Sequence, residues 1–169
     1  NQLIYIPQNP YVFTASLREN IAFYTPQSSD EDIKNAIHIV GLDDLLKELP
    51  DELNTIIGQG KRVLSGGQAQ RIALARAFLD KKRKIMVFDE PTAHLDIEKE
   101  VDLKQKMLPL MKNHLVIFAT HRLHWMKEMD YILVMDHGKL VEQGTFDELK
   151  QKNGYFVKLT QEMRGDQDD

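Results

Sequence analysis

The chain has 169 residues, enough for one domain with a buried core and too few for two complete domains. Its 22 Lys and Arg residues against 26 Asp and Glu residues give a formal net charge of −4, which excludes an overall basic field that would hold a nucleic-acid backbone or an anionic membrane surface. Cysteine is absent, so a disulfide framework and a thiolate metal cluster are excluded. Any phosphate ligand must therefore be bound by a local site.

One short strand opens the chain, and the segment up to Leu79 is predicted to be helical. Leu3–Ile6 is an apolar run followed by proline, which predicts a buried strand ending at Gln8. Ser28 and Glu31 have the spacing of a capping box, and the helix that they predict would end at Gly41.

From residue 84 onward the pattern changes to apolar runs that end in polar residues. These runs are Ile85–Phe88 before Asp89, Leu115–Ala119 before Thr120 and His121, and Tyr131–Met135 before Asp136. Their continuous hydrophobicity predicts strands buried on both faces, as in a parallel sheet. Helices expected over Ile97–Met111 and Arg122–Glu128 separate the runs, so the predicted class is α/β.

The end of the chain is predicted to form a hairpin and two helices. A turn at Asp136–Lys139 joins two strands, and Thr145 with Glu148 has the spacing of a capping box for the next helix. Tyr155–Met163 would be the last helix. The charged tail at 164–169 is predicted to be disordered.

Polar side chains follow four of the predicted strands, at Gln8, Asp89 with Glu90, Thr120 with His121, and Asp136. Ligands of an open parallel sheet bind beyond the carboxyl ends of its strands, which makes these residues candidates for nucleotide chemistry. Asp89 suits the binding of magnesium through water, and Glu90 suits the orientation or deprotonation of an attacking water. The alternative is an Asp-Glu-Pro turn that leaves both carboxylates solvated.

A second candidate site begins at Ser65. Ser65 and Gln68 have capping-box spacing ahead of an apolar helical face, so Ser65 is predicted to lie at a helix N-terminus. The free amides of that end and the small residues Gly66 and Gly67 would let a phosphate oxygen approach without any lysine. The alternative is a well-capped helix whose glycines only loosen the turn.

Taken together, five segments resemble the ordered motifs of the nucleotide-binding domain of ABC transporters. They are the glutamine loop Pro7-Gln8, the signature Leu64–Gln68, the Walker B strand Ile85–Glu90, the D-loop Pro91–Asp96 and the switch-histidine loop Thr120–Arg122. The resemblance implies a P-loop NTPase (RecA-like) fold with a parallel sheet core and an inserted α-helical signature subdomain. The implied parts of this partial domain, 1–169, are a helical subdomain at 9–80, core portions at 1–8 and 81–163, and the tail at 164–169.

The resemblance also implies that part of the domain is missing. No glycine-rich loop ending in Lys-Ser or Lys-Thr occurs in the sequence, so we expect an N-terminally truncated domain that lacks Walker A and is inactive alone. The strand that leads into Walker A would lie between the strand ending at His121 and the strand Tyr131–Met135. Direct pairing of those two strands would contradict this topology.

Roles for individual residues follow from the resemblance, together with ATP and Mg²⁺ as cofactors. Two domains would face each other head to tail, with each ATP between Walker A of one and the signature of the other. By position, the implied roles are γ-phosphate contacts from Ser65, Gly66, Gly67, Gln68 and His121, magnesium binding by Asp89 with Gln8, activation of water by Glu90, and a link across the dimer by Asp96. Simpler interpretations are an N-cap for Asp96, a loop amide for Gln8 and a satisfied strand-end histidine for His121.

Further positions narrow the resemblance to exporters. Pro7–Phe13 and Leu17–Ile21 resemble the exporter branch, whereas Ala69–Arg71 and Ala93–Asp96 resemble the heterodimeric cysteine or glutathione exporters that support cytochrome bd assembly. The implied partners are a second nucleotide-binding domain and transmembrane domains, at the cytoplasmic face of the cell membrane. No nucleic-acid partner is expected.

Two other classes of function are weighed against this one. A DNA-maintenance ATPase head uses the same chemistry, but it flanks long heptad repeats, and the sequence has neither these nor a basic face. A non-enzymatic module would bind only partners or a lone phosphate. The remaining histidines lack metal-ligand spacing and are interpreted as surface or packing residues: His38, His94, His114, His124 and His137.

Overall fold

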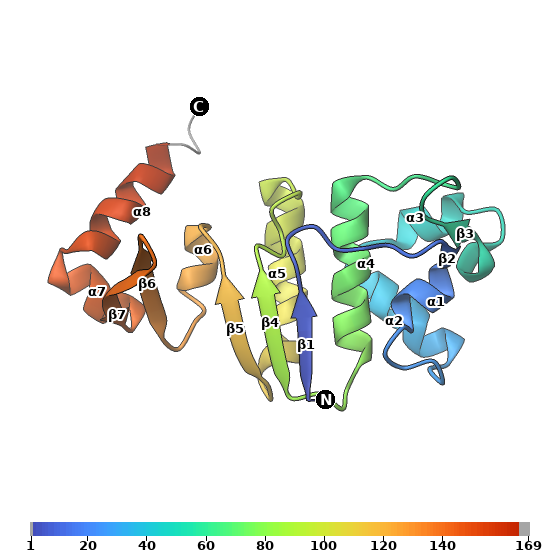
Figure 1. Cartoon of the computed structure of the whole chain (residues 1–169), viewed down its shortest axis with the longest axis horizontal. Coiled ribbons are helices and arrows are strands. Elements are labelled where there is room, and N and C mark those ends of the chain that lie inside the picture. The colour runs from blue at the N-terminus through green and yellow to red at the C-terminus, as the bar shows by residue number, and fades with distance from the viewer. Residues whose placement is uncertain (1, 166–169) are drawn as a thin grey trace. The chain divides into compact units, whose positions relative to one another are not determined.

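A three-stranded parallel sheet forms the centre of the first of two units in this computed structural model, which describes residues 2–165 (Figure 1). The strands β1 (Leu3–Ile6), β4 (Ile85–Asp89) and β5 (Leu115–Ala119) lie in the order β1-β4-β5. The helix α5 (Ile97–Met111) connects β4 to β5, at the bounds that the sequence predicts. The parallel sheet and the α/β order of this unit are therefore confirmed.

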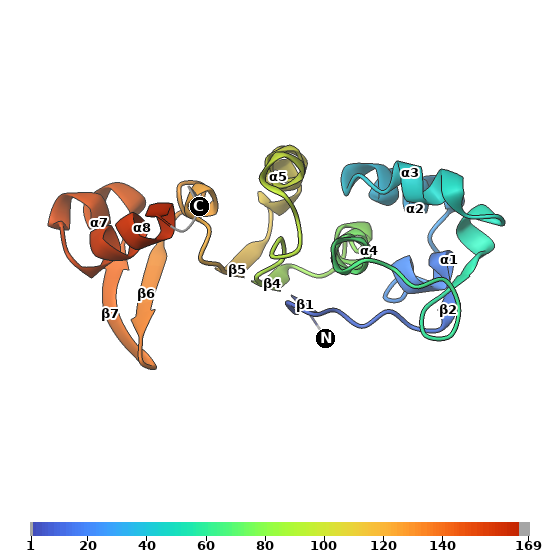
Figure 2. The ribbon, with the colours of Figure 1, turned by 90° about the horizontal axis from the view of Figure 1, so that it is seen from above.

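Only one face of this sheet is buried within the chain. Ile4, Ile6, Met86 and Phe88 are at most 2% exposed, and Figure 2 shows α5 over one face of the strands. On the opposite face the central strand's Ile85 and Val87 are half-buried, and the large apolar side chains of the two outer strands are 40–62% exposed: Leu3, Tyr5, Leu115 and Ile117. Successive side chains of a strand point to opposite faces, and α5 covers one face alone. The prediction of burial on both faces is therefore wrong for this chain.

The segment between β1 and β4 is helical, with one short exception. Its elements are α1 (Leu17–Ile21), α2 (Asp30–Ile39), α3 (Asp43–Glu48), the 3-10 helix η1 (Glu52–Asn54) and α4 (Gly66–Leu79). A short antiparallel ladder, which the sequence analysis missed, joins β2 (Ala15–Ser16) to β3 (Ile56–Ile57). Two-residue strands carry too little alternation for sequence patterns to reveal them.

The start of α2 is displaced by one residue from its predicted position. The N-cap is Ser29, whose hydroxyl accepts a hydrogen bond from the Asp32 amide at 3.1 Å. The predicted capping box of Ser28 and Glu31 is therefore wrong. Both serines have an acidic residue three positions later, so spacing alone does not distinguish them. The predicted stop at Gly41 is confirmed, because this residue has a left-handed φ of 69°.

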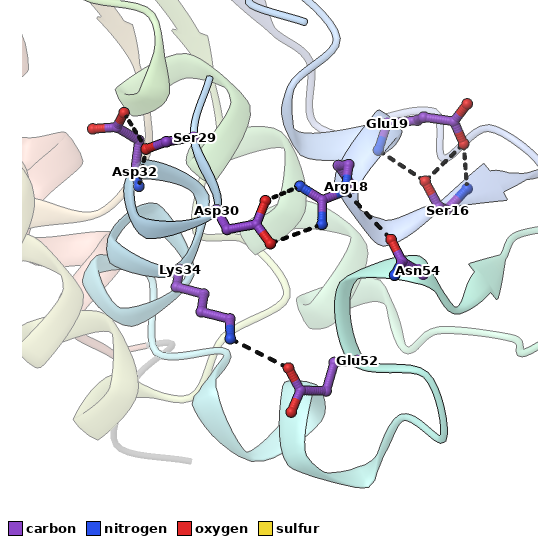
Figure 3. A network of polar contacts seen from close by, with 9 residues as sticks. All are labelled: Ser16, Arg18, Glu19, Ser29, Asp30, Asp32, Lys34, Glu52 and Asn54. Atoms are coloured by element: carbon purple, nitrogen blue, oxygen red, sulfur yellow. Dashed lines mark hydrogen bonds and ion pairs between the residues drawn. The ribbon is translucent and has the colours of Figure 1, made fainter. Parts of the chain in front are cut away.

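Surface charges connect α1, α2 and η1 (Figure 3). Arg18 binds both carboxylate oxygens of Asp30 and also donates to Asn54 at 3.4 Å. The hydrogen bond from Arg18 lowers the pKa of Asp30. The Asp30 side chain is 63% exposed, and exposed pairs contribute only about 0–1 kcal/mol. The buried residues of α2, Ile33 and Ile37, therefore hold this segment more firmly than its charges do.

The second unit contains a β-hairpin and helices. The strands β6 (Ile132–Asp136) and β7 (Lys139–Gly144) pair antiparallel, and left-handed backbone at the two turn residues confirms the predicted turn. The helices are α6 (Leu123–Met126), α7 (Phe146–Lys152) and α8 (Tyr155–Gly165). Their core contains Met126, Val134, Leu149 and Phe156.

One expectation for this unit agrees with the structure, and one needs correction. Within residues 2–165 the strand β6 pairs only with β7, so the direct ladder from β5 to β6 that would contradict the implied topology is absent from the described strands. Helix α8 includes Arg164 and Gly165, which the sequence analysis assigned to the tail. The rest of that tail, 166–169, lies outside the described residues.

We expect Asp80→Asn to destabilise the first unit. Asp80 ends α4, is 2% exposed, and accepts hydrogen bonds from the amides of Lys82 (2.8 Å) and Arg83 (3.2 Å) and from the Arg83 guanidinium. Burial alone would raise the pKa of Asp80, but these bonds outweigh it and lower the pKa below the ordinary 3.8. The substitution should cost about 1–3 kcal/mol of unfolding free energy at neutral pH, measured by thermal unfolding.

The lowered pKa of Asp80 also predicts how the effect of Asp80→Asn on stability depends on pH. A carboxylate with a lowered folded pKa stabilises the fold above its ordinary pKa of 3.8 and ceases to do so as the pH falls through the folded value. The difference between wild type and Asp80→Asn should therefore shrink in acid. Asp44→Asn is the control, because the Asp44 side chain is 92% exposed. Equal stability of the two variants at neutral pH would contradict the assignment.

Candidate functional site

The first residue of the signature helix is held by a reciprocal pair of hydrogen bonds. The Gln68 amide donates to the Ser65 hydroxyl at 3.1 Å, and the Ser65 amide donates to the Gln68 side-chain oxygen at 3.0 Å. Ser65 is the N-cap of α4, as the sequence predicts. The first amides of a helix have no partner within it, and the helix dipole makes this end attractive to an anion.

The loop that follows β4 packs on the two glycines of this helix start. A Cβ atom on Gly66 would lie 3.3 Å from the imidazole of His94, and one on Gly67 would lie 3.0 Å from the carbonyl oxygen of the same residue. Glycine therefore avoids a tight contact with the chain's own loop here, and it also leaves room for any approaching phosphate. The sequence analysis identified only the second reason.

A pocket of about 310 Å³ opens beside the helix start. It is lined by Ser65, Gly66, Gly67, Arg71, His94, Leu95, Asp96 and Lys99. A hollow of about 850 Å³ lies elsewhere in the first unit, but its lining contains none of the motif residues. The smaller pocket is the candidate site, because it combines a helix N-terminus with the cationic side chains of Arg71 and Lys99.

His94 is an exposed residue that packs on Gly66 and Gly67, as the interpretation as a surface or packing residue expects. It also lines the candidate pocket, which was not predicted, and its Nε2 lies 3.2 Å from the side-chain oxygen of Asn9. Its place between the Walker B carboxylates and Asp96 was the signal that sequence reasoning had available.

The two carboxylates predicted for nucleotide chemistry lie at the carboxyl end of β4. Asp89 accepts a hydrogen bond from the Tyr5 hydroxyl at 3.2 Å, and partial burial together with this bond raises the pKa of Tyr5. Glu90 has a left-handed φ of 47°, rare for a residue other than glycine, and its amide donates to the Ala119 carbonyl at 2.9 Å. Both residues are half-buried, so the fully solvated turn is not what this sheet edge contains.

The donors at this edge fit magnesium, provided that a nucleotide completes the coordination. Mg²⁺ is usually held by one or two carboxylates, several waters and substrate phosphates, and Asp89 supplies one such carboxylate. Within residues 2–165, no group of three or more acidic, histidine or cysteine side chains is arranged to hold a metal by itself. The edge therefore suits a metal that arrives with phosphates.

The other predicted site residues are spread over both units. Asp96 is the N-cap of α5, accepting from the Lys99 amide at 2.9 Å, and its side-chain bond to Lys99 lowers its pKa. Gln8 follows β1, with an exposed side chain. His121 is exposed and belongs to the second unit. The simple N-cap interpretation of Asp96 is thus confirmed, while the nucleotide roles of these three residues stay predictions.

The sequence analysis overlooked Gln70. Its side chain is fully buried and donates hydrogen bonds to the carbonyls of Gln8, at 3.3 Å, and Glu90, at 2.9 Å. A glutamine among the apolar residues of a predicted helix was the available signal, since a buried amide needs partners. This side chain brings the glutamine loop and the Walker B end to the signature helix.

None of the helices within residues 2–165 has the length and apolar character required to cross a membrane.

Comparison with known proteins gives one consistent result. The ABC transporter family profile matches residues 1–93, which is more than half of the chain. The chain is 54% identical to the glutathione/L-cysteine transport system ATP-binding/permease protein CydC of Bacillus subtilis (strain 168), over 97% of the chain and 29% of that protein. It is 37% identical to the protein of the same name in Escherichia coli (strain K12), over 92% of the chain and 27% of that protein.

A solved structure extends the likeness to three dimensions. A bacterial Atm1-family ABC exporter with ATP bound superposes with a TM-score of 0.87 and 31% identity, over 96% of this chain and 29% of that one. The chain thus spans less than a third of the length of each of these relatives. With the signature helix, the Walker B carboxylates and the D-loop assembled in one unit, these matches show that the chain belongs to the ABC transporter family.

Proposed function

We propose that this chain is part of the ATP-hydrolysing motor domain of an ABC exporter. The observation that carries the proposal is the packing of the D-loop onto Gly66 and Gly67, which places an anion-attracting helix start beside the loop that leaves Asp89 and Glu90. Phosphoryl transfer to water requires a phosphate site and a carboxylate pair, and in the proposed head-to-tail dimer the helix start of one chain and the carboxylates of the other would act on the same nucleotide.

Each motif residue has a distinct role in this proposal. The Ser65 hydroxyl and the amides of Gly66, Gly67 and Gln68 bind the γ-phosphate of ATP held by a second domain, supported by the positive end of the helix dipole. His121 contacts a γ-phosphate. Asp96 connects the two sites across the dimer.

The carboxylates act on the metal and the water. Asp89, together with Gln8, holds Mg²⁺, which when bound neutralises charge on the phosphate oxygens. Glu90 orients the attacking water and accepts its proton. The left-handed backbone of Glu90 supports this role, since strained residues concentrate where a side chain must be aimed in one direction.

The proposed setting is the cytoplasmic face of a membrane, with transmembrane domains and a second nucleotide-binding domain as partners. The relatives named as ATP-binding/permease proteins support the link to membrane domains. Identity of 54% to a glutathione/L-cysteine transport protein supports a thiol exporter, and within that proposal the second domain belongs to a different chain.

We expect Glu90→Gln in the full-length protein to abolish turnover and spare ATP binding. Loss of a general base typically slows a reaction by about a hundred- to ten-thousand-fold, while the amide keeps the size of the side chain. Steady-state phosphate release and nucleotide binding measure the two effects. Glu98→Gln, an exposed substitution on α5, is the control and should retain the wild-type rate. A Glu90→Gln rate within about twofold of wild type would remove Glu90 from the proposed mechanism.

Ser65→Arg should separate binding from turnover in another way. The arginine stem would occupy the phosphate approach, so a monomeric full domain should bind ATP with a Kd within about twofold of wild type while the dimer fails to hydrolyse it. The control is Ser29→Arg, which removes the same kind of N-cap from α2, worth about 1 kcal/mol, away from the pocket. Equal loss of binding and turnover in Ser65→Arg would indicate a folding defect and contradict the assignment.

A further inference from the structure

One buried side chain, that of Gln70, contacts the backbone of three segments distant in sequence. Gln70 is 0% exposed and lies on α4, five residues after Ser65. Its amide nitrogen donates to the carbonyls of Gln8 (3.3 Å) and Glu90 (2.9 Å), and its oxygen accepts from the amide of His94 (3.2 Å). These partners belong to the glutamine loop, the Walker B end and the D-loop.

The chemistry of a carboxamide fits this position closely. The side chain of glutamine has two N–H donors and one carbonyl oxygen, and here both donors and the oxygen are used. Glutamate at this position would present only acceptors to two carbonyl oxygens. Methionine has a similar length but would leave the Gln8 carbonyl and the His94 amide without this partner, and would remove one of the two bonds to the Glu90 carbonyl. No side chain of the same length replaces all three bonds.

The bond to Glu90 has a particular consequence, because the backbone of Glu90 is strained. Its φ of 47° is kept by a hydrogen bond from its amide to the Ala119 carbonyl and by two bonds to its carbonyl, from Gln70 at 2.9 Å and from the Ala93 amide at 3.2 Å. These bonds fix the peptide groups on both sides of the Glu90 Cα atom, and hence the direction in which its carboxylate leaves the chain. A strained conformation persists only where its surroundings determine it in this way.

The hydrogen bond from the His94 amide to the Gln70 side chain connects the D-loop to α4. His94 packs on Gly66 and Gly67 and also contacts the Asn9 side chain at 3.2 Å. The D-loop is thereby fixed both to the glycines that open α4 and, through Gln70, to the first turns of the same helix. A displacement of α4 cannot occur without moving the Glu90 and His94 segments or breaking these bonds.

We propose that Gln70 is a positioning residue, which couples the binding of a phosphate at the N-terminus of α4 to the orientation of the Glu90 carboxylate in the same chain. This inference rests on the proposed function, in which the signature serves the nucleotide of a second domain. It adds a path inside one chain between the two nucleotide sites of a dimer. Gln70 itself contacts neither nucleotide nor water in this role.

The test is a double-mutant cycle in the full-length protein. Gln70→Met and Gln70→Glu are made alone and together with Glu90→Gln, and hydrolysis of radiolabelled ATP is followed in single turnovers and at steady state. Each Gln70 variant should lower kcat about tenfold to a hundredfold, as expected for a displaced catalytic group, while KM changes by less than about threefold. In the Glu90→Gln background the same substitutions should change the residual rate by less than about twofold, because the carboxylate that Gln70 is proposed to orient has already been removed.

A matched control separates positioning from loss of stability. Asn20 is also a fully buried amide, and it bonds to the amide of Phe13 at 2.8 Å and to the carbonyls of Phe13 and Ser16 at 3.0 and 3.1 Å, away from Glu90. Asn20→Leu should lower the unfolding temperature as Gln70→Met does. Its kcat per folded molecule should nevertheless stay near that of wild type.

Several outcomes would overturn the inference, and they differ from failure of the proposed function. A Gln70 variant with wild-type kcat, or one that slows both backgrounds equally, would show that Gln70 only supports the fold. A wild-type rate of ATP hydrolysis in the Gln70→Glu variant would show that the two hydrogen bonds donated by Gln70 are dispensable. Unchanged hydrolysis in Glu90→Gln alone would instead refute the proposed function, whatever the Gln70 variants do.

Discussion

The buried amide of Gln70 satisfies the backbone of three loops at once, and the organisation of the first unit depends on it. Where each of those loops departs from a strand or helix, its backbone N–H and C=O groups need new hydrogen-bond partners. Burial makes an unmade hydrogen bond costly. By accepting from His94 and donating to Gln8 and Glu90, the side chain holds the D-loop, the glutamine loop and the Walker B end against one helix. The helix start and the carboxylates are therefore joined within one compact unit.

In the proposed function, local electrostatics would account for phosphate binding by a chain with a net charge of −4. The helix start at Ser65 supplies oriented amides, while Arg71 and Lys99 add cationic side chains to the same pocket. Burial lowers the pKa of Arg71, a shift that Asp96 opposes. A site of this kind depends on the direction of a few groups, which a count of charges over the whole sequence does not reveal.

Backbone conformation at the site is constrained from inside the chain as well as by ligands. Gly67 is restricted by the His94 carbonyl, and Glu90 is held in a left-handed conformation by bonds on both of its sides. The apolar outer face of the parallel sheet is not constrained by such packing, because it is exposed and none of the helices described in the first unit covers it. Packing is thus concentrated between the helices and the inner face, where the motif loops begin.

The sequence by itself determined the features that depend on residues close together in the chain. Reciprocal caps at Ser65 and Thr145 link residues three apart, and α5 and β5 follow from uninterrupted local patterns. Motif order identified the family and pointed to Asp89 and Glu90. Even so, two equally spaced serines left the start of α2 ambiguous.

Only the tertiary structure decided which face of the sheet is buried and that Gln70 joins segments 20, 24 and 62 residues away. The physical reason is that a cap forms within one turn of helix, whereas these contacts exist only after the parallel sheet has brought the ends of β1 and β4 to one edge.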